Sequence, residues 1–324
     1  MKRKTVIFLS AILFSVLSGG VAFACDFCLL SQGISPLDTV RGAGIRVVER
    51  YTRLKSVYRG AEKISNPGAE EKYWTTELTG FFAITGDTTL QIVVPLRKTE
   101  ADAHLHVHPD GTLEAERVKA REFGLGDMAV LGRYTFFKKH AIDATLTAAL
   151  VAGIKFPTGK TDAKTGDGAE YLDSHLQPGT GSWDFLLGLS ASHAVRKFSM
   201  SANLLGVVTT EGEAGDIKHR FGNALNYDLT GKFRVYPEEV SPSAGQVFLA
   251  LGLNGELRGR EEERPGGRLK NSGGHTVYLS PGVQLVMTPN LVLEASYQHA
   301  VYHNLHGTQM GEDHKAIGGM TYLF

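Results

Sequence analysis

Residues 246–258 read QVFLALGLNGELR, and this stretch decides the fold class. Its odd-numbered positions carry valine, leucine or glycine, whereas the even-numbered positions include Asn254, Glu256 and Arg258. Alternation with a period of two is typical of a β-strand whose two faces meet different surroundings. An amphipathic helix would instead place its apolar residues three and four positions apart. The stretch therefore predicts a long strand with one apolar and one polar face.

The same alternation recurs along the chain. Residues 142–156 and 221–235 repeat it most clearly, and turn-forming residues separate successive segments. Such repeats predict an all-β fold, an antiparallel transmembrane β-barrel of about 12 strands, because single-chain bacterial barrels usually have an even number. The predicted strands cover residues 45–58, 73–85, 88–98, 128–137, 142–156, 183–194, 197–209, 221–236, 246–258, 275–287, 291–303 and 314–324.

The lengths of the connections support a barrel independently. Every odd-numbered connection is predicted to be longer than every even-numbered one, as expected for outer loops and periplasmic turns. The predicted turns are 86–87, 138–141, 195–197, 237–245 and 288–290. The predicted outer loops are 59–72, 99–127, 157–182, 210–220, 259–274 and 304–313. The chain ends in GGMTYLF, which resembles the terminal strand by which outer-membrane barrels are recognised for insertion.

The N-terminal residues predict export. A basic stretch at residues 2–4 precedes an apolar run over 6–17, and Ala-Phe-Ala at 22–24 forms a cleavage site. The predicted location is the outer membrane of a Gram-negative cell, where lipid surrounds the barrel. We therefore assign residues 1–24 to a cleaved signal peptide, 25–44 to a periplasmic N-terminal segment with a Cys-x-x-Cys motif, and 45–324 to the barrel.

Charge and motifs narrow the classes of function. The chain has 34 lysines and arginines and 34 aspartates and glutamates, so its formal net charge is zero. This balance excludes a protein that binds nucleic acid through a strongly basic surface. The chain has no G-x-S-x-G, H-E-x-x-H or Walker motif. We therefore predict that it is not an enzyme and has no catalytic residue and no cofactor.

Three stretches resemble a known family. They are residues 124–127 with the following Arg133-Tyr134, residues 153–160 and residues 176–184. In these stretches, in residues 288–291 and in its Tyr-Leu-Phe end, the chain is similar to outer-membrane barrels of the "Putative MetA-pathway of phenol degradation" family. The resemblance covers residues 70–324 and implies a barrel associated with uptake of small, often aromatic compounds. The cysteine motif and the histidines of the second outer loop are not part of that pattern.

The polar face of the strands predicts which charged residues line the lumen. Six acids and seven bases give no ion-selective field, and in a barrel narrower than the general porins they are expected to pair across it. Two interpretations stay open, a polar and constricted conduit for a small solute or a packed, charge-neutralised plug. The predicted lumen residues are Glu77, Arg97, Arg133, Asp143, Lys155, Asp184, Asp228, Lys232, Arg234, Glu256, Arg258, Glu294 and Lys315.

Histidines and cysteines supply the candidate ligands. His104, His106 and His108 alternate and would point the same way on an extended chain, where neutral imidazoles bind zinc, copper or nickel. A solvated loop without a metal is the competing interpretation. Cys25 and Cys28 predict a disulfide, or a redox or metal pair, in the oxidising periplasm. Lipid modification of Cys25 stays open as an alternative.

Together these features predict an outer-membrane channel or transporter for small, hydrophobic or aromatic solutes. Its expected partners are outer-membrane lipid and a small-molecule solute, without nucleic acid. The alternative is a non-transporting barrel that binds a metal, or a periplasmic or surface redox partner, through the Cys-x-x-Cys motif and the loop histidines. A continuous lumen with solute-dependent flux would distinguish the first from the second.

Overall fold

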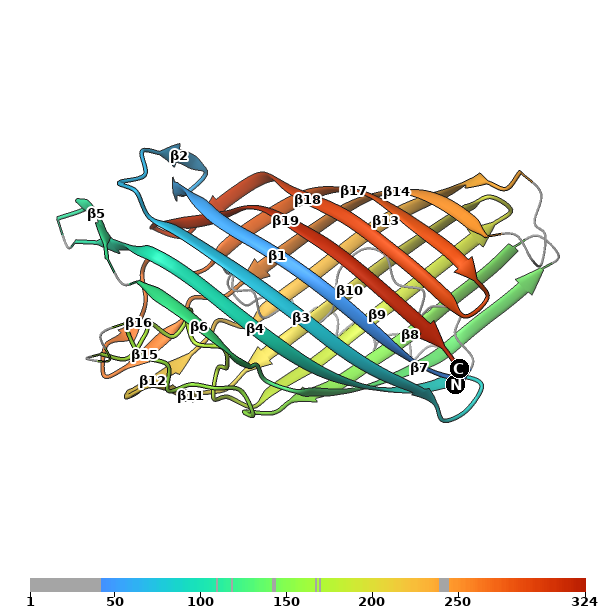
Figure 1. Ribbon diagram of the computed structural model, residues 1–324, viewed down its shortest axis with the longest axis horizontal. Coiled ribbons are helices and arrows are strands. Elements are labelled where there is room, and N and C mark those ends of the chain that lie inside the picture. The colour runs from blue at the N-terminus through green and yellow to red at the C-terminus, as the bar shows by residue number, and fades with distance from the viewer. Residues whose placement is uncertain are drawn as a thin grey trace, which may run out of the picture.

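Twelve long antiparallel strands form a closed barrel in the computed structural model, which describes residues 42–108, 110–117, 119–141, 144–166, 168, 170–238 and 245–324 (Figure 1). Each strand pairs with its neighbour in the chain, and the last pairs with the first. The predicted all-β barrel is therefore confirmed. Its strands are β1 (Ala43–Arg59), β3 (Glu70–Ala83), β4 (Thr88–Val107), β7 (Ala129–Ala141), β8 (Ala144–Lys155), β9 (Asp184–Val195), β10 (Phe198–Thr209), β13 (Ala224–Tyr236), β14 (Gln246–Arg258), β17 (Gly274–Thr288), β18 (Leu291–Leu305) and β19 (Thr308–Leu323).

Part of the sequence prediction falls outside the described residues. The predicted signal peptide, Cys25, Cys28 and Asp143 all lie there. Within the part of the chain that the structure describes, no helix is long and apolar enough to cross a membrane.

The alternation places apolar side chains outside and polar side chains inside the barrel. On β14, Leu249, Leu251 and Leu253 are 55%, 57% and 44% exposed, whereas Asn254 and Glu256 are buried. Leucine is seldom so exposed in water at successive alternate positions, but lipid covers the outer wall of a membrane barrel. The polar residues are shielded because they face the narrow interior. The stretch 246–258 thus coincides with one strand whose two faces are those expected.

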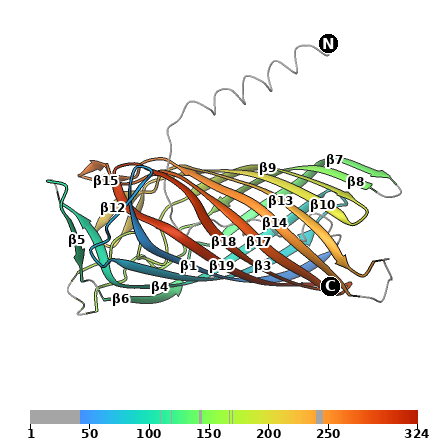
Figure 2. The same cartoon turned by 90° about the horizontal axis from the view of Figure 1, so that it is seen from above.

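The outer connections carry secondary structure of their own at one end of the barrel, on the left in Figures 1 and 2. The connection between β1 and β3 contains β2 (Glu62–Ile64). The next outer connection contains β5 (Leu113–Glu116) and β6 (Ala120–Leu125), which both pair with β4. A separate four-stranded sheet consists of β11 (Gly212–Ala214), β12 (Ile217–Arg220), β15 (Glu262–Arg264) and β16 (Gly267–Arg268).

Two predicted outer loops are partly strand. β4 continues to Val107, so His104 and His106 lie in a strand and not in a loop. Only His306 and Gly307 join β18 to β19, although an outer loop was predicted over 304–313. The expectation that every outer connection exceeds every turn is therefore wrong for this hairpin, because β13 and β14 are separated by residues 237–245. Residues 308–313 are mostly polar, but their pairing with β1 keeps them extended.

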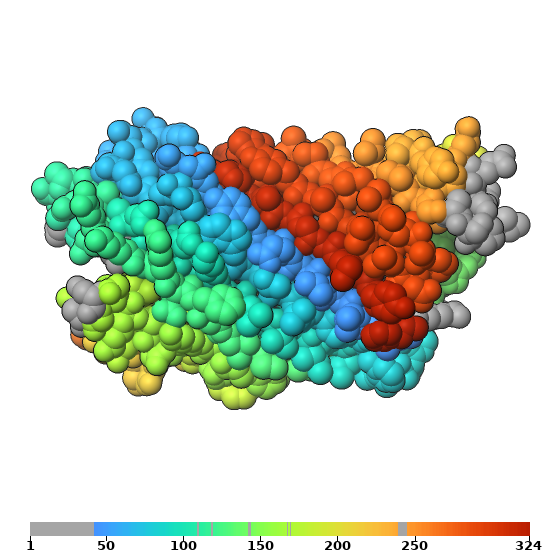
Figure 3. Space-filling view, in the orientation of Figure 1, coloured from blue at the N-terminus to red at the C-terminus, as the bar shows by residue number. Residues whose placement is uncertain are grey.

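The first and last strands meet at a seam, where Figure 3 shows blue and red residues side by side. A buried ion pair crosses this seam. Arg46 of β1 pairs with Glu294 of β18, and the two side chains are only 8% and 5% exposed. The pair spans Gly319 of β19, where a Cβ atom would lie 2.6 Å from the Glu294 carboxylate. Gly319 therefore provides the space in which this ion pair can join β18 to β1.

We expect Gly319→Val to lower the stability of the barrel by about 3 kcal/mol, the cost of separating a buried ion pair. The measurement is the midpoint of urea unfolding in lipid vesicles, followed by heat-modifiable gel migration. Gly318→Val is the matched control, because a Cβ at Gly318 meets no atom within 4 Å. Equal midpoints for the two variants would contradict the role assigned to Gly319.

Candidate functional site

The structure buries most of the predicted lumen residues on the inner wall. Arg133 and Lys232 are half-buried, and Asp143 lies outside the described residues. The buried ones are Glu77, Arg97, Lys155, Asp184, Asp228, Arg234, Glu256, Arg258, Glu294 and Lys315. The prediction missed other buried charges, Arg46, Arg50, Asp127 and Glu312, because they lie on the irregular first strand or in segments expected to be loops.

Opposite charges meet inside the barrel. Arg50 Nη1 lies 3.4 Å from Glu77 Oε2, and Lys315 Nζ lies 2.7 Å from Glu312 Oε2. Tyr278 donates a hydrogen bond to Glu312, and its ring centroid lies 4.8 Å from Lys315 Nζ. Buried charges are tolerated when they are paired in this way. The pairs leave these parts of the inner wall polar but locally neutral.

The connection between β8 and β9, residues 156–183, lies against the inner wall at the outer end, and we call it the inner loop. Arg97 of β4 donates to the carbonyl oxygens of His175 and Gln177, both at 3.2 Å. Thr99, the next inward-facing residue of β4, donates to the carbonyl oxygen of Leu176 at 2.9 Å. Because Arg97 and Thr99 are buried on the inner wall, these bonds place residues 175–177 inside the mouth of the barrel.

Asp127 fastens both ends of the inner loop. Its carboxylate accepts the backbone N–H of Gly159 at 2.9 Å and that of Thr180 at 2.8 Å. The same carboxylate lies 2.9 Å from Lys155 Nζ, which also lies 2.7 Å from Asp184. We call Asp127, Lys155, Gly159, Thr180 and Asp184 the loop clamp. Both carboxylates and the ammonium group are nearly inaccessible to solvent, so each needs the others as partners.

Two glycines let the ends of the inner loop meet. A Cβ on Gly159 would lie 2.6 Å from the backbone of Gly179, and a Cβ on Gly179 would lie 2.6 Å from the backbone of Gly159. A side chain at either position would therefore force the two ends apart. The stretches 124–127, 153–160 and 176–184 thus meet at one point in space, although they are separated in the sequence.

An apolar cluster joins the inner loop to the wall of the barrel. Leu172 and Leu176 of the inner loop pack in one cluster with Leu54 of β1, Leu105 of β4 and Met310 of β19. All five are at most 8% exposed. We call these five residues the mouth cluster. The mouth cluster attaches the inner loop to the wall through apolar packing, which is not directional.

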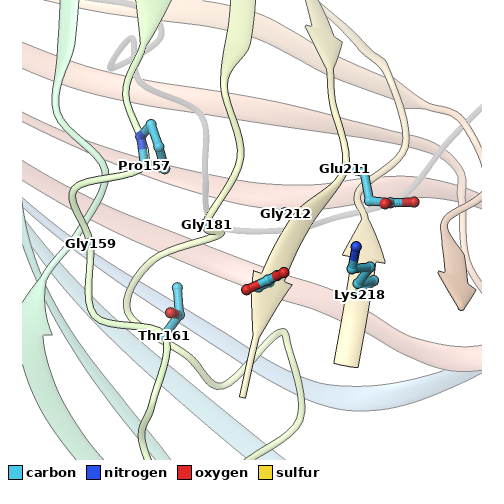
Figure 4. Close-up of a pocket in the computed structure, with 8 residues that line it drawn as sticks. Pro157, Gly159, Thr161, Gly181, Glu211, Gly212 and Lys218 are labelled. Atoms are coloured by element: carbon cyan, nitrogen blue, oxygen red, sulfur yellow. The ribbon is translucent and has the colours of Figure 1, made fainter. Parts of the chain in front are cut away.

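A polar cleft of about 380 Å³ opens beside the loop clamp (Figure 4). Thr161 of the inner loop and Lys218 of β12 line it together with Glu211 and Glu213. Gly181, at φ +67°, packs so tightly on β11 that a Cβ would lie 2.4 Å from the carbonyl oxygen of Glu213. The base of the inner loop is therefore fixed against the outer sheet.

The three alternating histidines each face a different carboxylate. The nearest approach of a ring nitrogen to a carboxylate oxygen is 2.6 Å for His104 and Glu71, 3.9 Å for His106 and Glu116, and 3.0 Å for His108 and Glu114. Metal binding by these histidines stays a prediction.

In the described residues, a different set converges as a three-ligand group, namely His175, His219 and Glu261. These three residues lie on three different connections and no short motif links them, so no local sequence pattern predicts the group.

Known proteins share the sequence pattern and the fold. The profile of a family described as "Putative MetA-pathway of phenol degradation" matches residues 68–304. An outer-membrane channel from Pseudomonas putida F1 has a TM-score of 0.65 and 16% identity, covering 90% of this chain and 100% of that one. The β domain of the Bordetella autotransporter BrkA (TM-score 0.44, 14% identity, coverage 87% and 100%) and the P. putida toluene transporter TodX (TM-score 0.38, 9% identity, coverage 89% and 91%) are more distant. No curated protein sequence matches the chain.

We expect Asp127→Ala to release the inner loop, since both of its ends lose their shared acceptor. Trypsin should then cleave after Lys160 or Lys164 in the folded protein, whereas the wild type resists under the same conditions. Gel electrophoresis with mass spectrometry of the fragments measures this. Asp162→Ala is the matched control, because Asp162 is exposed on the same loop. Cleavage of both variants at the same rate would argue against the clamp.

Proposed function

Because the chain belongs to the "Putative MetA-pathway of phenol degradation" family, we propose that it is an outer-membrane channel or transporter for small, hydrophobic or aromatic solutes. Its barrel is closed, its outer wall is apolar, and the P. putida F1 protein that shares the fold is an outer-membrane channel. In this proposal residues 1–24 direct export and are removed, and residues 25–44 remain in the periplasm.

The observation that carries the proposal is the mouth cluster. We infer that a solute from outside displaces Leu172 and Leu176, which are buried in this cluster, before it reaches the paired charges of the lumen. Apolar groups gain about 0.8 kcal/mol per buried CH₂ on leaving water, so small aromatic molecules would be favoured at this point.

The inner loop is the element that would admit the solute. Its segment 172–177, which we call the tip, is held to the wall by hydrogen bonds from Arg97 and Thr99 and by apolar contacts of the mouth cluster. Displacement of Leu172 and Leu176 from the wall would open a route between the loop and β4. The loop clamp would stay in place during this motion, because its buried charges depend on one another.

Uptake by intact Gram-negative cells tests the proposal. Cells that express the protein should take up radiolabelled phenol and toluene faster than cells that lack it, and heat-modifiable migration should verify its folding. Intact cells are needed because aromatic solutes cross phospholipid vesicles unaided. Vesicle swelling with sugars and salts supplies the companion measurement for polar solutes. Equal aromatic uptake with and without folded protein would contradict the proposal.

We expect Leu176→Asn to slow aromatic uptake about tenfold, because the solute loses apolar contact worth roughly 1.5 kcal/mol at the mouth cluster. The control is Glu170→Gln, an exposed position on the same loop, which should leave uptake unchanged. Uptake rates at several solute concentrations measure the effect. An equal change in sugar and aromatic flux would show that the variant alters the loop as a whole and that the cluster does not select solutes.

A further inference from the structure

Two histidines and a glutamate from three different outer connections converge at the mouth of the barrel. His175 belongs to the inner loop, His219 to β12, and Glu261 precedes β15. Nε2 of His175 lies 2.9 Å, and Nε2 of His219 lies 3.0 Å, from the same oxygen, Oε2 of Glu261. The side chains of His219 and Glu261 are at most 1% exposed, whereas that of His175 is 28% exposed. An ion from solution can therefore reach the group past His175.

The surroundings of His219 match those of a metal ligand. Its other ring nitrogen, Nδ1, lies 3.3 Å from the Glu263 carboxylate and 3.3 Å from the Ser174 hydroxyl. Metal-bound imidazoles almost always direct their second nitrogen at such a partner, which fixes the tautomer and the ring. Phe221 covers one side, with its ring centroid 4.4 Å from that of His219. The ring is therefore held in place from three directions.

Without a metal, the two imidazoles share one buried carboxylate oxygen. Both Nε2 atoms must then carry protons to donate to Oε2 of Glu261. A divalent ion would replace the Nε2 protons, so both imidazoles would be neutral and Glu261 would keep a positive partner.

We propose that His175, His219 and Glu261 bind a divalent transition-metal ion, for which Zn²⁺ is the best match. Zinc holds nitrogen and oxygen ligands at about 2.0–2.2 Å in a tetrahedron, which sets neighbouring ligand atoms roughly 3.3 Å apart. The three ligand atoms here lie within 4.8 Å of one another, so small side-chain rotations suffice. The fourth position is left for water, and Cu²⁺ and Ni²⁺ also accept imidazole ligands.

The ion would attach the inner loop to the outer sheet. His219 lies in that sheet, and Glu261 adjoins it, whereas His175 lies at the tip of the inner loop beside Leu176. This attachment is separate from the loop clamp, which holds the base of the loop. Metal binding is therefore expected to restrict the tip, whatever solute the barrel admits.

Zn²⁺ titration of the full-length, folded chain against a chromophoric chelator tests the site. The wild type should bind one tight equivalent, which His219→Ala and Glu261→Gln each weaken at least 100-fold. A triple variant in which His104, His106 and His108 are all replaced by alanine is the matched control and should keep that equivalent. Equal stoichiometry and affinity in the wild type and in both single variants would overturn the proposal.

Substitution of the buried His219 or Glu261 can unfold the protein, so a second experiment uses a variant at the partly exposed ligand. His175→Ala removes the partly exposed ligand, and heat-modifiable migration verifies that the barrel is folded. At a higher trypsin concentration, which cleaves the wild type slowly, Zn²⁺ should slow cleavage of the inner loop several-fold compared with chelator, and in His175→Ala it should have no effect. Cleavage that responds equally to Zn²⁺ in both proteins would overturn the assignment of His175 as a ligand.

Discussion

Closure of the hydrogen-bonded ring is the constraint on which the rest of the structure depends. Lipid offers no partner for a backbone N–H or C=O, so the first strand must pair with the last, and it does so from Gly44 opposite Leu323 to Arg59 opposite Thr308. Closure divides every strand into a lipid face and an inner face. It also forces each charge on the inner face to find a partner within the barrel. Arg46 and Glu294 meet this demand and join the two sides of the seam.

The part of the fold that lipid controls could be predicted from sequence. Residues 246–258 alternate because one face meets lipid and the other the lumen, and they form one strand with the predicted bounds. The first strand was harder to assign, because Arg46 and Arg50 point inward while Glu49 and Arg53 point outward, so neither face is plainly apolar. Its partner β19 begins at Thr308 because of backbone pairing, which the polar side chains of residues 308–313 do not reveal.

The candidate site could not be predicted from the sequence in the same way. The inner loop has no period, and its position depends on contacts between residues distant in sequence, such as Arg97 with the carbonyl oxygen of Gln177. The sequence contained the pieces of the loop clamp as three family-like stretches, but nothing in their spacing showed that Asp127 binds both ends of one loop. Contacts between residues so distant in sequence can be identified only from the folded structure.

The inner loop is attached unequally along its length, and this difference decides how it can move. At its base, Asp127 and Lys155 are buried charges, and separating such a pair costs several kcal/mol. At its tip, the attachments are hydrogen bonds to neutral carbonyl groups, each worth roughly 1 to 3 kcal/mol net, and apolar contacts. Motion should therefore pivot about the base and displace the tip. His175 lies at that tip. An ion that joins His175 to His219 and Glu261 would therefore hold the most weakly attached part of the loop, where a small binding free energy is enough to keep it closed.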